Sequence, residues 1–181
     1  HKFQTNRTKN KIYLEEKNKF RDIYLLRLFN PHKFILEIDE ISLNHNIVNT
    51  ARNFLGCEPI IISSQIWWTY PFYNESGELS NPPGNEYGFH YDVDDFKFLK
   101  LFFYLNDVDE TCGPHVYVKN NGKKSIKEYI NRRVDDNYVL QNYKDRIKTI
   151  LGKAGSGFIE DTSFYHKGTN PIASSGRGVL Q

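Results

Sequence analysis

The chain has 181 residues, of which 39% are hydrophobic and 15% aromatic, and its formal net charge is +2. This length fits one domain over residues 1–181, and the composition is sufficient for a buried core. Lysines are scattered among acids, which gives no support to nucleic-acid binding, and no apolar run is long enough to span a membrane. Two cysteines do not make a disulfide framework, so we expect a reduced, cytoplasmic setting. The absence of methionine suggests that the chain is trimmed or incomplete at its ends.

Residues 1–56 are predicted to form an N-terminal helical flank. Apolar side chains at helical spacing over residues 11–29 predict a helix that ends before Pro31. The segment "FILEIDEI" alternates briefly, which is typical of a short strand. Ser42 is a suitable N-cap for a second helix, "LNHNIVNTARNFL", and Gly56 is suited to end it.

Residues 57–181 are predicted to form a core of short strands. The segments "PIIISSQIWWTY" and "HVYV" and residues 96–105 are rich in β-branched and aromatic residues, as strands are. Residues 125–150 have helical spacing and indicate a helical insertion. Glycine-punctuated short strands return in "GKAGSGFIEDTSFYHKGTN" and "GRGVLQ". A mainly β fold with flanking helices, an antiparallel sandwich or jelly roll, suits this order better than a doubly wound sheet.

The stretch "YGFHYDVDDFKFLKLFFYLNDV" places His90 and Asp92 directly before a strongly apolar run. Side chains two apart on a strand lie on the same face, so this pair can present an imidazole and a carboxylate to one point. A facial triad for Fe(II) needs two histidines, one carboxylate and open coordination positions. The alternative is a solvated strand entrance. Asp94 and Asp95 are interpreted as turn and rim acids in either case.

The candidate for the third ligand is His166. It follows a strand and a turn in "FIEDTSFYHKGTN", from which its side chain could reach back across a rolled sheet. His115, after "CGP", is the reserve ligand. The alternative for His166 is a surface histidine in a turn.

Arg177 begins the last strand and lies among small residues in "SSGRG". Small neighbours leave room for a planar anion to meet the fork of guanidinium donors. A cosubstrate that chelates iron at one end could therefore meet Arg177 with a carboxylate at its other end. The alternative is an ordinary arginine at a sheet edge.

The ordered set of His90-x-Asp92, the Gly-Pro pair after Cys112, His166 and Arg177 resembles the phytanoyl-CoA dioxygenase family of Fe(II)- and 2-oxoglutarate-dependent oxygenases. The resemblance covers roughly residues 65–181. It implies a double-stranded β-helix, a cupin-like jelly roll.

The same resemblance implies the site. Fe(II) would be held by His90, Asp92 and His166, and the distal carboxylate of 2-oxoglutarate would be bound by Arg177. The cofactor set would be Fe(II) and 2-oxoglutarate, with ascorbate as a possible reductant, and O2 and a small organic molecule would be the other partners. The reaction would be a hydroxylation that releases succinate and CO2. The sequence departs from the family's pattern at two places. "VKNNGKK" stands where the family often has a "PGSH" stretch. After His166 the family often has a serine, and the nearest hydroxyl here is that of Thr169.

The substrate is not defined by the sequence. The long loop of residues 71–88 could act as a lid. Aromatic residues lie before this loop and at its start, and they line either a cavity mouth or the core: Trp67, Trp68, Tyr70, Phe72 and Tyr73. Lys97 and Lys100 are interpreted as solvated. A non-catalytic jelly-roll binding module and a peptide or protein hydroxylase of the same superfamily are the alternatives, and the oligomeric state is left open.

Overall fold

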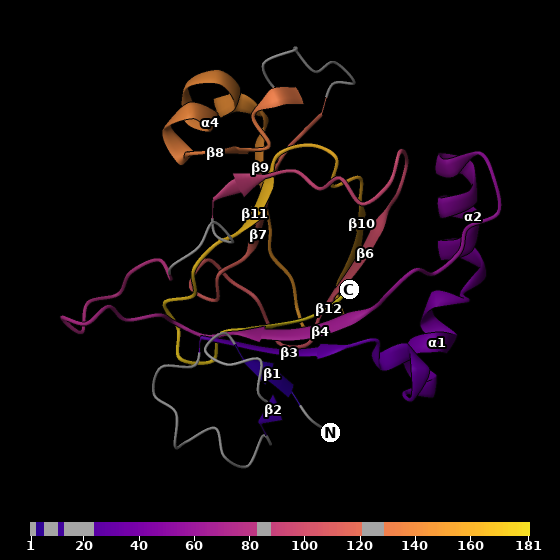
Figure 1. Ribbon diagram of the computed structural model, residues 1–181, viewed down its shortest axis with the longest axis horizontal. Helices are drawn as coiled ribbons and strands as arrows, with labels where there is room; N and C mark the ends of the chain where they lie inside the picture. Colours follow the sequence, from indigo (N-terminus) through magenta and orange to yellow (C-terminus); the bar gives the residue numbers. More distant parts are fainter. Residues whose placement is uncertain (1–2, 6–10, 13–23, 83–87, 121–128) are drawn as a thin grey trace.

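The computed structural model describes residues 3–5, 11–12, 24–82, 88–120 and 129–181. Within these residues the chain forms two antiparallel sheets that enclose an interior between them (Figure 1). The sheets are built from strands that lie far apart in the sequence. The site described below lies between them.

The larger sheet has seven strands in the order β10-β6-β12-β4-β3-β1-β2. The strands are β1 (Phe3–Thr5), β2 (Lys11–Ile12), β3 (Leu25–Phe29), β4 (Gln65–Thr69), β6 (Lys100–Tyr104), β10 (Gly157–Glu160) and β12 (Arg177–Leu180). The last strand along the chain, β12, pairs with both β4 and β6. Arg177 therefore lies in the middle of this sheet, and the arginine is not at an edge.

The smaller sheet has five strands in the order β8-β5-β11-β7-β9. They are β5 (Phe89–His90), β7 (His115–Val118), β8 (Arg133–Val134), β9 (Ile147–Ile150) and β11 (His166–Gly168). Because β11 lies between β5 and β7, three histidines enter the structure on adjacent strands.

The strands of the smaller sheet alternate between two environments, as the period of two requires. Their outward side chains, Phe89 and Val116 among them, pack with Val139 and Tyr143 of α4 (Asp136–Tyr143). The inward side chains face the larger sheet, where a second apolar cluster surrounds Phe102 and Tyr104. This alternation turns the histidines of the smaller sheet inward.

The remaining helices are α1 (Leu36–Ser42), α2 (His45–Leu55) and the short 3₁₀ segments η2 (Pro31–Lys33) and η3 (Lys144–Arg146). Helices α1 and α2 stand at one side of the sheets, and α4 covers the opposite end of the molecule (Figure 1). Among the described residues, no helix combines the length and the apolar character needed to cross a membrane. Cys57 is exposed and Cys112 is buried, and both are free thiols.

The helix predicted over residues 11–29 is wrong in its described parts. Residues 11–12 and 25–29 are the strands β2 and β3, and β3 pairs with β4 along its whole length. Leu25 and Leu26 are both buried, because one face of β3 meets the interior and the other meets Trp68 and its neighbours. A strand with two apolar faces has no period of two, so its pattern is easily taken for a helix.

The strand predicted for "FILEIDEI" is also wrong, since α1 occupies most of it. Ser42 is not an N-cap: its hydroxyl donates to the carbonyls of Ile38 and Asp39 at the end of α1. Asn44 caps α2 instead, by accepting a hydrogen bond from the Asn46 amide. The stop at Gly56 is confirmed, with a φ of 79° that suits glycine.

Residues 1–56 are therefore not a purely helical flank, because β1, β2 and β3 belong to the larger sheet. The helical insertion predicted over residues 125–150 is right for residues 129–130, which are helical, and for α4. Its first four residues lie outside the described residues, and its last four form strand β9. The strand expected over residues 96–105 is limited to β6, since Phe96 is fully exposed. Of "PIIISSQIWWTY", only the residues of β4 form a strand.

Candidate metal centre

His90 and His166 lie opposite each other on the antiparallel pair formed by β5 and β11. Their ring centroids are 4.5 Å apart. Both side chains point into the interior between the sheets. The register of this strand pair therefore brings together two histidines that the sequence separates widely.

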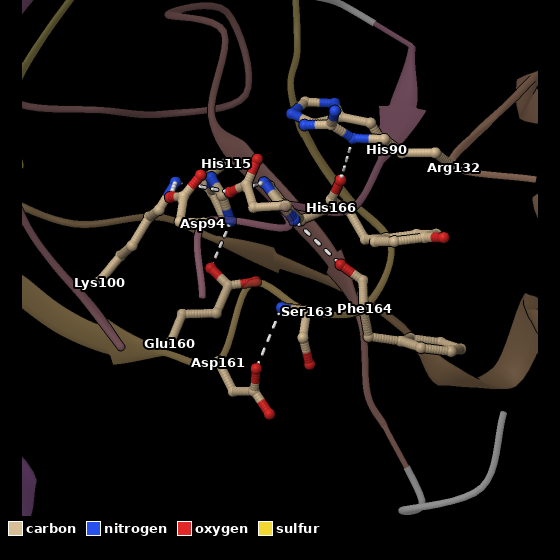
Figure 2. A network of polar contacts seen from close by, with 12 residues as sticks. His90, Asp94, Lys100, His115, Arg132, Glu160, Asp161, Ser163, Phe164 and His166 are labelled. Atoms are coloured by element: carbon tan, nitrogen blue, oxygen red, sulfur yellow. Dashed lines mark hydrogen bonds and ion pairs between the residues drawn. The ribbon is translucent and has the colours of Figure 1, made fainter. Parts of the chain in front are cut away.

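Each imidazole is oriented by a carbonyl two residues before it. Nδ1 of His90 lies 2.9 Å from the carbonyl oxygen of Gly88. Nδ1 of His166 lies 3.0 Å from the carbonyl oxygen of Phe164 (Figure 2). A carbonyl oxygen only accepts, so Nδ1 carries the proton in each neutral ring. Nε2 of both rings is then left with a free lone pair, which is the arrangement found in histidines that bind metals.

Asp92 completes the cluster, although it lies just past the end of β5. Its backbone amide donates to the carbonyl of Thr162 at 2.8 Å, which fixes the chain at this point. The Asp92 carboxylate lies 3.4 Å from Nε2 of His166. One potential ligand atom from each of His90, Asp92 and His166 lies within 4.8 Å of the other two. The structure thus brings the three predicted ligands together.

The protonation states of the cluster suit a cation. Burial, followed by the charge of neighbouring His90, lowers the pKa of His166 to about 4. Burial also lowers the pKa of His90. For Asp92, burial acts to raise the pKa, but the hydrogen bond from Lys100 and the nearby positive charges outweigh it, so the pKa is lowered. At neutral pH the site holds two neutral imidazoles and one carboxylate.

Lys100 is not a solvated lysine, contrary to the sequence interpretation. Its ammonium lies 2.7 Å from Asp92 Oδ2 and 2.8 Å from Asp94 Oδ2, and its side chain is 18% exposed. Asp94 is a rim acid, as predicted from its position, with a side chain that is 52% exposed. Lys100 lies at the start of β6 and faces inward, a placement that only the register of the larger sheet reveals.

His115, the reserve ligand, is buried beside the cluster but outside it. Its ring stacks on that of His166 with centroids 5.6 Å apart. Its Nε2 lies 2.6 Å from Oε2 of Glu160 (Figure 2). The sequence analysis did not identify Glu160. This residue lies two positions after Phe158 and therefore on the same face of β10, and that spacing could have identified it.

Arg177 is buried in the wall of the same interior. One guanidinium nitrogen donates to the carbonyl of Gly113. Gly168, on β11, lies directly against the guanidinium: a Cβ at this position would collide with the other terminal nitrogen of Arg177. The absence of a side chain at Gly168 therefore makes room for Arg177.

A cavity of about 350 Å³ connects these groups. It is lined by side chains of both sheets: Leu25, Arg27, Trp67, Thr69, His90, Asp92, Lys100, Phe102, His115, Arg133, His166, Gly168, Arg177 and Gln181. The cavity is small compared with ligand pockets in general, which span roughly 300 to 1,000 Å³.

Thr169 is not among the residues that line this cavity. Its hydroxyl donates to the carbonyl of Pro114 at 2.9 Å, and the residue borders a separate surface hollow with Asn170 and Asp136. The structure therefore brings Arg177 to the proposed ligands but does not bring Thr169 there.

The aromatic residues before the long loop divide between two roles. Trp67 lines the cavity together with Thr69, which lies on the same face of β4. Trp68 points to the other side, where it stacks on Tyr70 and donates to the carbonyl of Ser175. Phe72 packs edge-on against Tyr24. Tyr73 is 55% exposed, and residues 83–87 of the predicted lid lie outside the described residues.

No protein-family model and no curated protein sequence matches the chain. Solved structures do match. EctD from S. alaskensis with bound Fe is 18% identical, with a TM-score of 0.61 over 87% of this chain and 55% of that chain. SnoK, a non-heme alpha ketoglutarate dependent carbocyclase from nogalamycin biosynthesis, is 16% identical, with a TM-score of 0.58 over 88% of this chain and 62% of that chain. HygX from Streptomyces hygroscopicus, with nickel and 2-oxoglutarate bound, is 13% identical, with a TM-score of 0.55 over 87% of this chain and 67% of that chain.

The chain thus spans little more than half the length of EctD. The predicted fold class is confirmed: the protein is mainly β, with two antiparallel sheets in a double-stranded β-helix, the cupin-like jelly roll. The assignment to the phytanoyl-CoA dioxygenase family stays a prediction.

Proposed function

We propose that the protein is an Fe(II)- and 2-oxoglutarate-dependent oxygenase that hydroxylates a small organic molecule. The observation that carries this proposal is the convergence of His90, Asp92 and His166 at one end of a cavity whose wall also contains Arg177. The fold supports it, because the same architecture holds iron in EctD and nickel with 2-oxoglutarate in HygX.

The residues present fit Fe(II). Two imidazole nitrogens and one carboxylate, all from the protein, make the donor set of the facial triad, which leaves the other coordination positions of an octahedral ion for cosubstrate and O2. Both imidazoles are neutral and have Nε2 free, so no proton must be removed before a cation binds. His90, Asp92 and His166 would be the ligands.

When bound, Fe(II) supplies the oxygen chemistry, in which oxidative decarboxylation of 2-oxoglutarate to succinate and CO2 accompanies insertion of one oxygen atom into a C–H bond of the substrate. The chain's own residues position the reactants. The carbonyls of Gly88 and Phe164 hold the two imidazoles in one tautomer and orientation. Lys100 keeps the Asp92 carboxylate ionised and has Asp94 as a second partner when a cation arrives at Asp92.

Arg177 would bind the distal carboxylate of 2-oxoglutarate. A buried guanidinium is suited to a bidentate contact with a carboxylate, and the missing side chain at Gly168 leaves room for this one beside β11. A contact from Thr169 to the cosubstrate stays a prediction that a Thr169→Val variant tests. Ascorbate would act only as a reductant that keeps the iron ferrous.

Small molecules suit the cavity better than peptides. About 350 Å³ must hold both 2-oxoglutarate and the part of the substrate that reacts. Side chains of both sheets line this space, and its volume suits a small molecule better than a stretch of peptide. A small substrate also agrees with EctD, whose structure contains 2-oxoglutarate and 5-hydroxyectoine.

Succinate formation distinguishes this enzyme from a non-catalytic jelly-roll binding module. Purified protein with Fe(II), ascorbate, 2-oxoglutarate and air should form succinate slowly even without its substrate. The rate should exceed that of free Fe(II) and should vanish in His166→Ala. A rate equal to the free-iron background in the presence of bound 2-oxoglutarate would favour the binding module.

A further inference from the structure

Arg27 is a cavity-lining cation that the proposed reaction does not use. It lies on β3 directly opposite Trp67 of β4. Leu25, two residues earlier on the same face, also lines the cavity. The alternation of β3 therefore turns the Arg27 side chain inward, toward the space where a substrate would lie.

The Arg27 guanidinium has no counter-ion or side-chain hydrogen bond within the described part of the chain. Its Nε is buried without a hydrogen-bond partner. The one side-chain interaction that Arg27 makes there is with the ring of Phe29, whose centroid is 5.8 Å from Cζ. Lys100, in the same cavity, has two carboxylate partners instead.

The Arg27 guanidinium is partly withdrawn from water and has no counter-ion among the residues that the structure describes. Burial of a charge is unfavourable unless it is paired, so such a group binds an anion more readily than an exposed arginine does. The terminal nitrogens of the guanidinium can make two parallel hydrogen bonds to a carboxylate. Trp67 and Leu25 provide apolar surface on either side of it.

Arg27 and Arg177 start from different places on the larger sheet. Arg177 is opposite Thr69 on β4, Thr69 is opposite Leu25 on β3, and Arg27 is two residues further along β3. Two strand spacings and two residues correspond to roughly 12 Å between the two backbone positions. The two arginines therefore enter the cavity from different strands and at different heights, which allows Arg27 to bind a carboxylate other than the one proposed for Arg177.

We propose that the substrate is an organic carboxylate whose carboxylate group is bound by Arg27 and whose apolar part packs against Trp67. This inference rests on the proposed function, in which Arg177 is reserved for 2-oxoglutarate. It makes Arg27 a specificity-determining residue that orients the substrate without touching the metal.

Matched acids and amides test this assignment. The full chain is loaded anaerobically with Mn(II) and saturating 2-oxoglutarate, so that the Arg177 site is filled and no turnover occurs. Benzoate, phenylacetate and 3-phenylpropionate are titrated against their neutral amides, with quenching of tryptophan fluorescence as the readout. The variants are Arg27→Gln, Arg27→Lys and the control Arg52→Gln, which removes an arginine paired with Glu58 on the protein surface.

We expect wild type and Arg52→Gln to bind at least one acid tenfold or more tightly than its amide. In Arg27→Gln this preference should fall below twofold, and in Arg27→Lys it should be partly retained, because a lysine keeps the charge but not the fork of donors. The affinity for 2-oxoglutarate, measured separately, should change less than threefold. Arg27→Lys also provides a test if Arg27→Gln does not fold.

Three results overturn the inference. The first is a wild type that prefers none of the acids, and the second is an acid preference that survives in Arg27→Gln. The third is a tenfold weaker binding of 2-oxoglutarate in Arg27→Gln, which would assign Arg27 to the cosubstrate. If the wild type with Mn(II) does not bind 2-oxoglutarate at all, the proposed function fails, and this inference fails with it.

Discussion

His90 and His166 are cross-strand partners, with ring centroids 4.5 Å apart and Nδ1 of each ring hydrogen-bonded to a backbone carbonyl. The backbone, rather than other side chains, thus sets the orientation of both rings. A site held in this way is formed before a metal arrives, and the two rings need not reorganise to bind one.

Replacement of a proposed ligand should remove metal binding and leave the fold intact. Substitutions of groups around metal ligands already weaken metal binding by roughly 10- to 100-fold, so His90→Ala, Asp92→Ala and His166→Ala should each weaken Fe(II) binding by about 100-fold or more. Calorimetry under anaerobic conditions measures the affinity, and circular dichroism measures the fold. His45→Ala, on the exposed surface of α2, is the matched control. Full affinity in His166→Ala would make His115 the next candidate.

Arg177→Ala should raise the concentration of 2-oxoglutarate needed for half saturation by roughly 100-fold, because a buried bidentate pair contributes a few kcal/mol to binding. Arg177→Lys should recover part of the loss. Gly168→Ala should also weaken 2-oxoglutarate binding, because its new methyl group would displace the guanidinium. Titration of 2-oxoglutarate under anaerobic iron provides the comparison. Unchanged affinity in Arg177→Ala would separate this arginine from the cosubstrate.

Lys100→Met should destabilise the metal-free protein by about 2–4 kcal/mol, because it leaves the largely buried Asp92 carboxylate without its partner. Mn(II) should restore more stability to Lys100→Met than it adds to wild type, since the cation replaces the missing positive charge. Denaturant unfolding with and without Mn(II) measures both effects. Lys153→Met is the control: its pair with Asp107 is exposed to solvent, so its loss should change the stability far less. Equal stabilisation by Mn(II) in all three proteins would show that Lys100 does not influence the metal site.

The metal-free protein should lose stability as the pH falls from about 6.5 to about 4. His166 has its ordinary pKa of 6.5 in the unfolded chain and a pKa of about 4 in the fold, lowered by burial and by His90. In this window the unfolded state binds a proton that the folded state does not, so stability rises with pH. The contribution of His166 between pH 7 and pH 5 is about 2 kcal/mol.

Urea unfolding at several pH values checks this slope. His166→Asn removes the titrating group and keeps a donor for the Phe164 carbonyl, so its stability should depend less on pH, with a remainder due to His90. His45→Asn should behave as wild type does. An unchanged slope in His166→Asn would mean that another group controls the acid sensitivity.

The residues that the sequence could identify are those whose roles depend on local spacing. His90 and Asp92 are two apart, and a period of two predicts that both can face one point. Gly56 ends a helix through its own backbone conformation, which the sequence also predicts. The short strands of residues 57–181 favoured an antiparallel sandwich or jelly roll, and the resemblance to the phytanoyl-CoA dioxygenase family implied the double-stranded β-helix.

The residues that the sequence could not identify depend on which strands become neighbours. Lys100 carries no local mark that separates it from a solvated lysine, and only the convergence of β6 with the end of β5 gives it Asp92 as a partner. Glu160 likewise meets His115 only because β10 and β7 face the same interior. The pattern of residues 25–29 predicts a helix because both faces of β3 are covered, which removes the strand period.

The most direct test of the metal and cosubstrate site is an anaerobic titration of the purified protein with Fe(II) and 2-oxoglutarate, followed by visible absorption. Chelation of protein-bound Fe(II) through the keto and carboxylate oxygens of 2-oxoglutarate produces a charge-transfer band that neither component shows alone. We predict that this band appears with one Fe(II) per chain in the wild type, is absent in His166→Ala, and requires far more 2-oxoglutarate in Arg177→Ala. A wild type that binds no Fe(II), or a band of equal intensity in His166→Ala, would contradict the assignment of His90, Asp92 and His166 as the iron site.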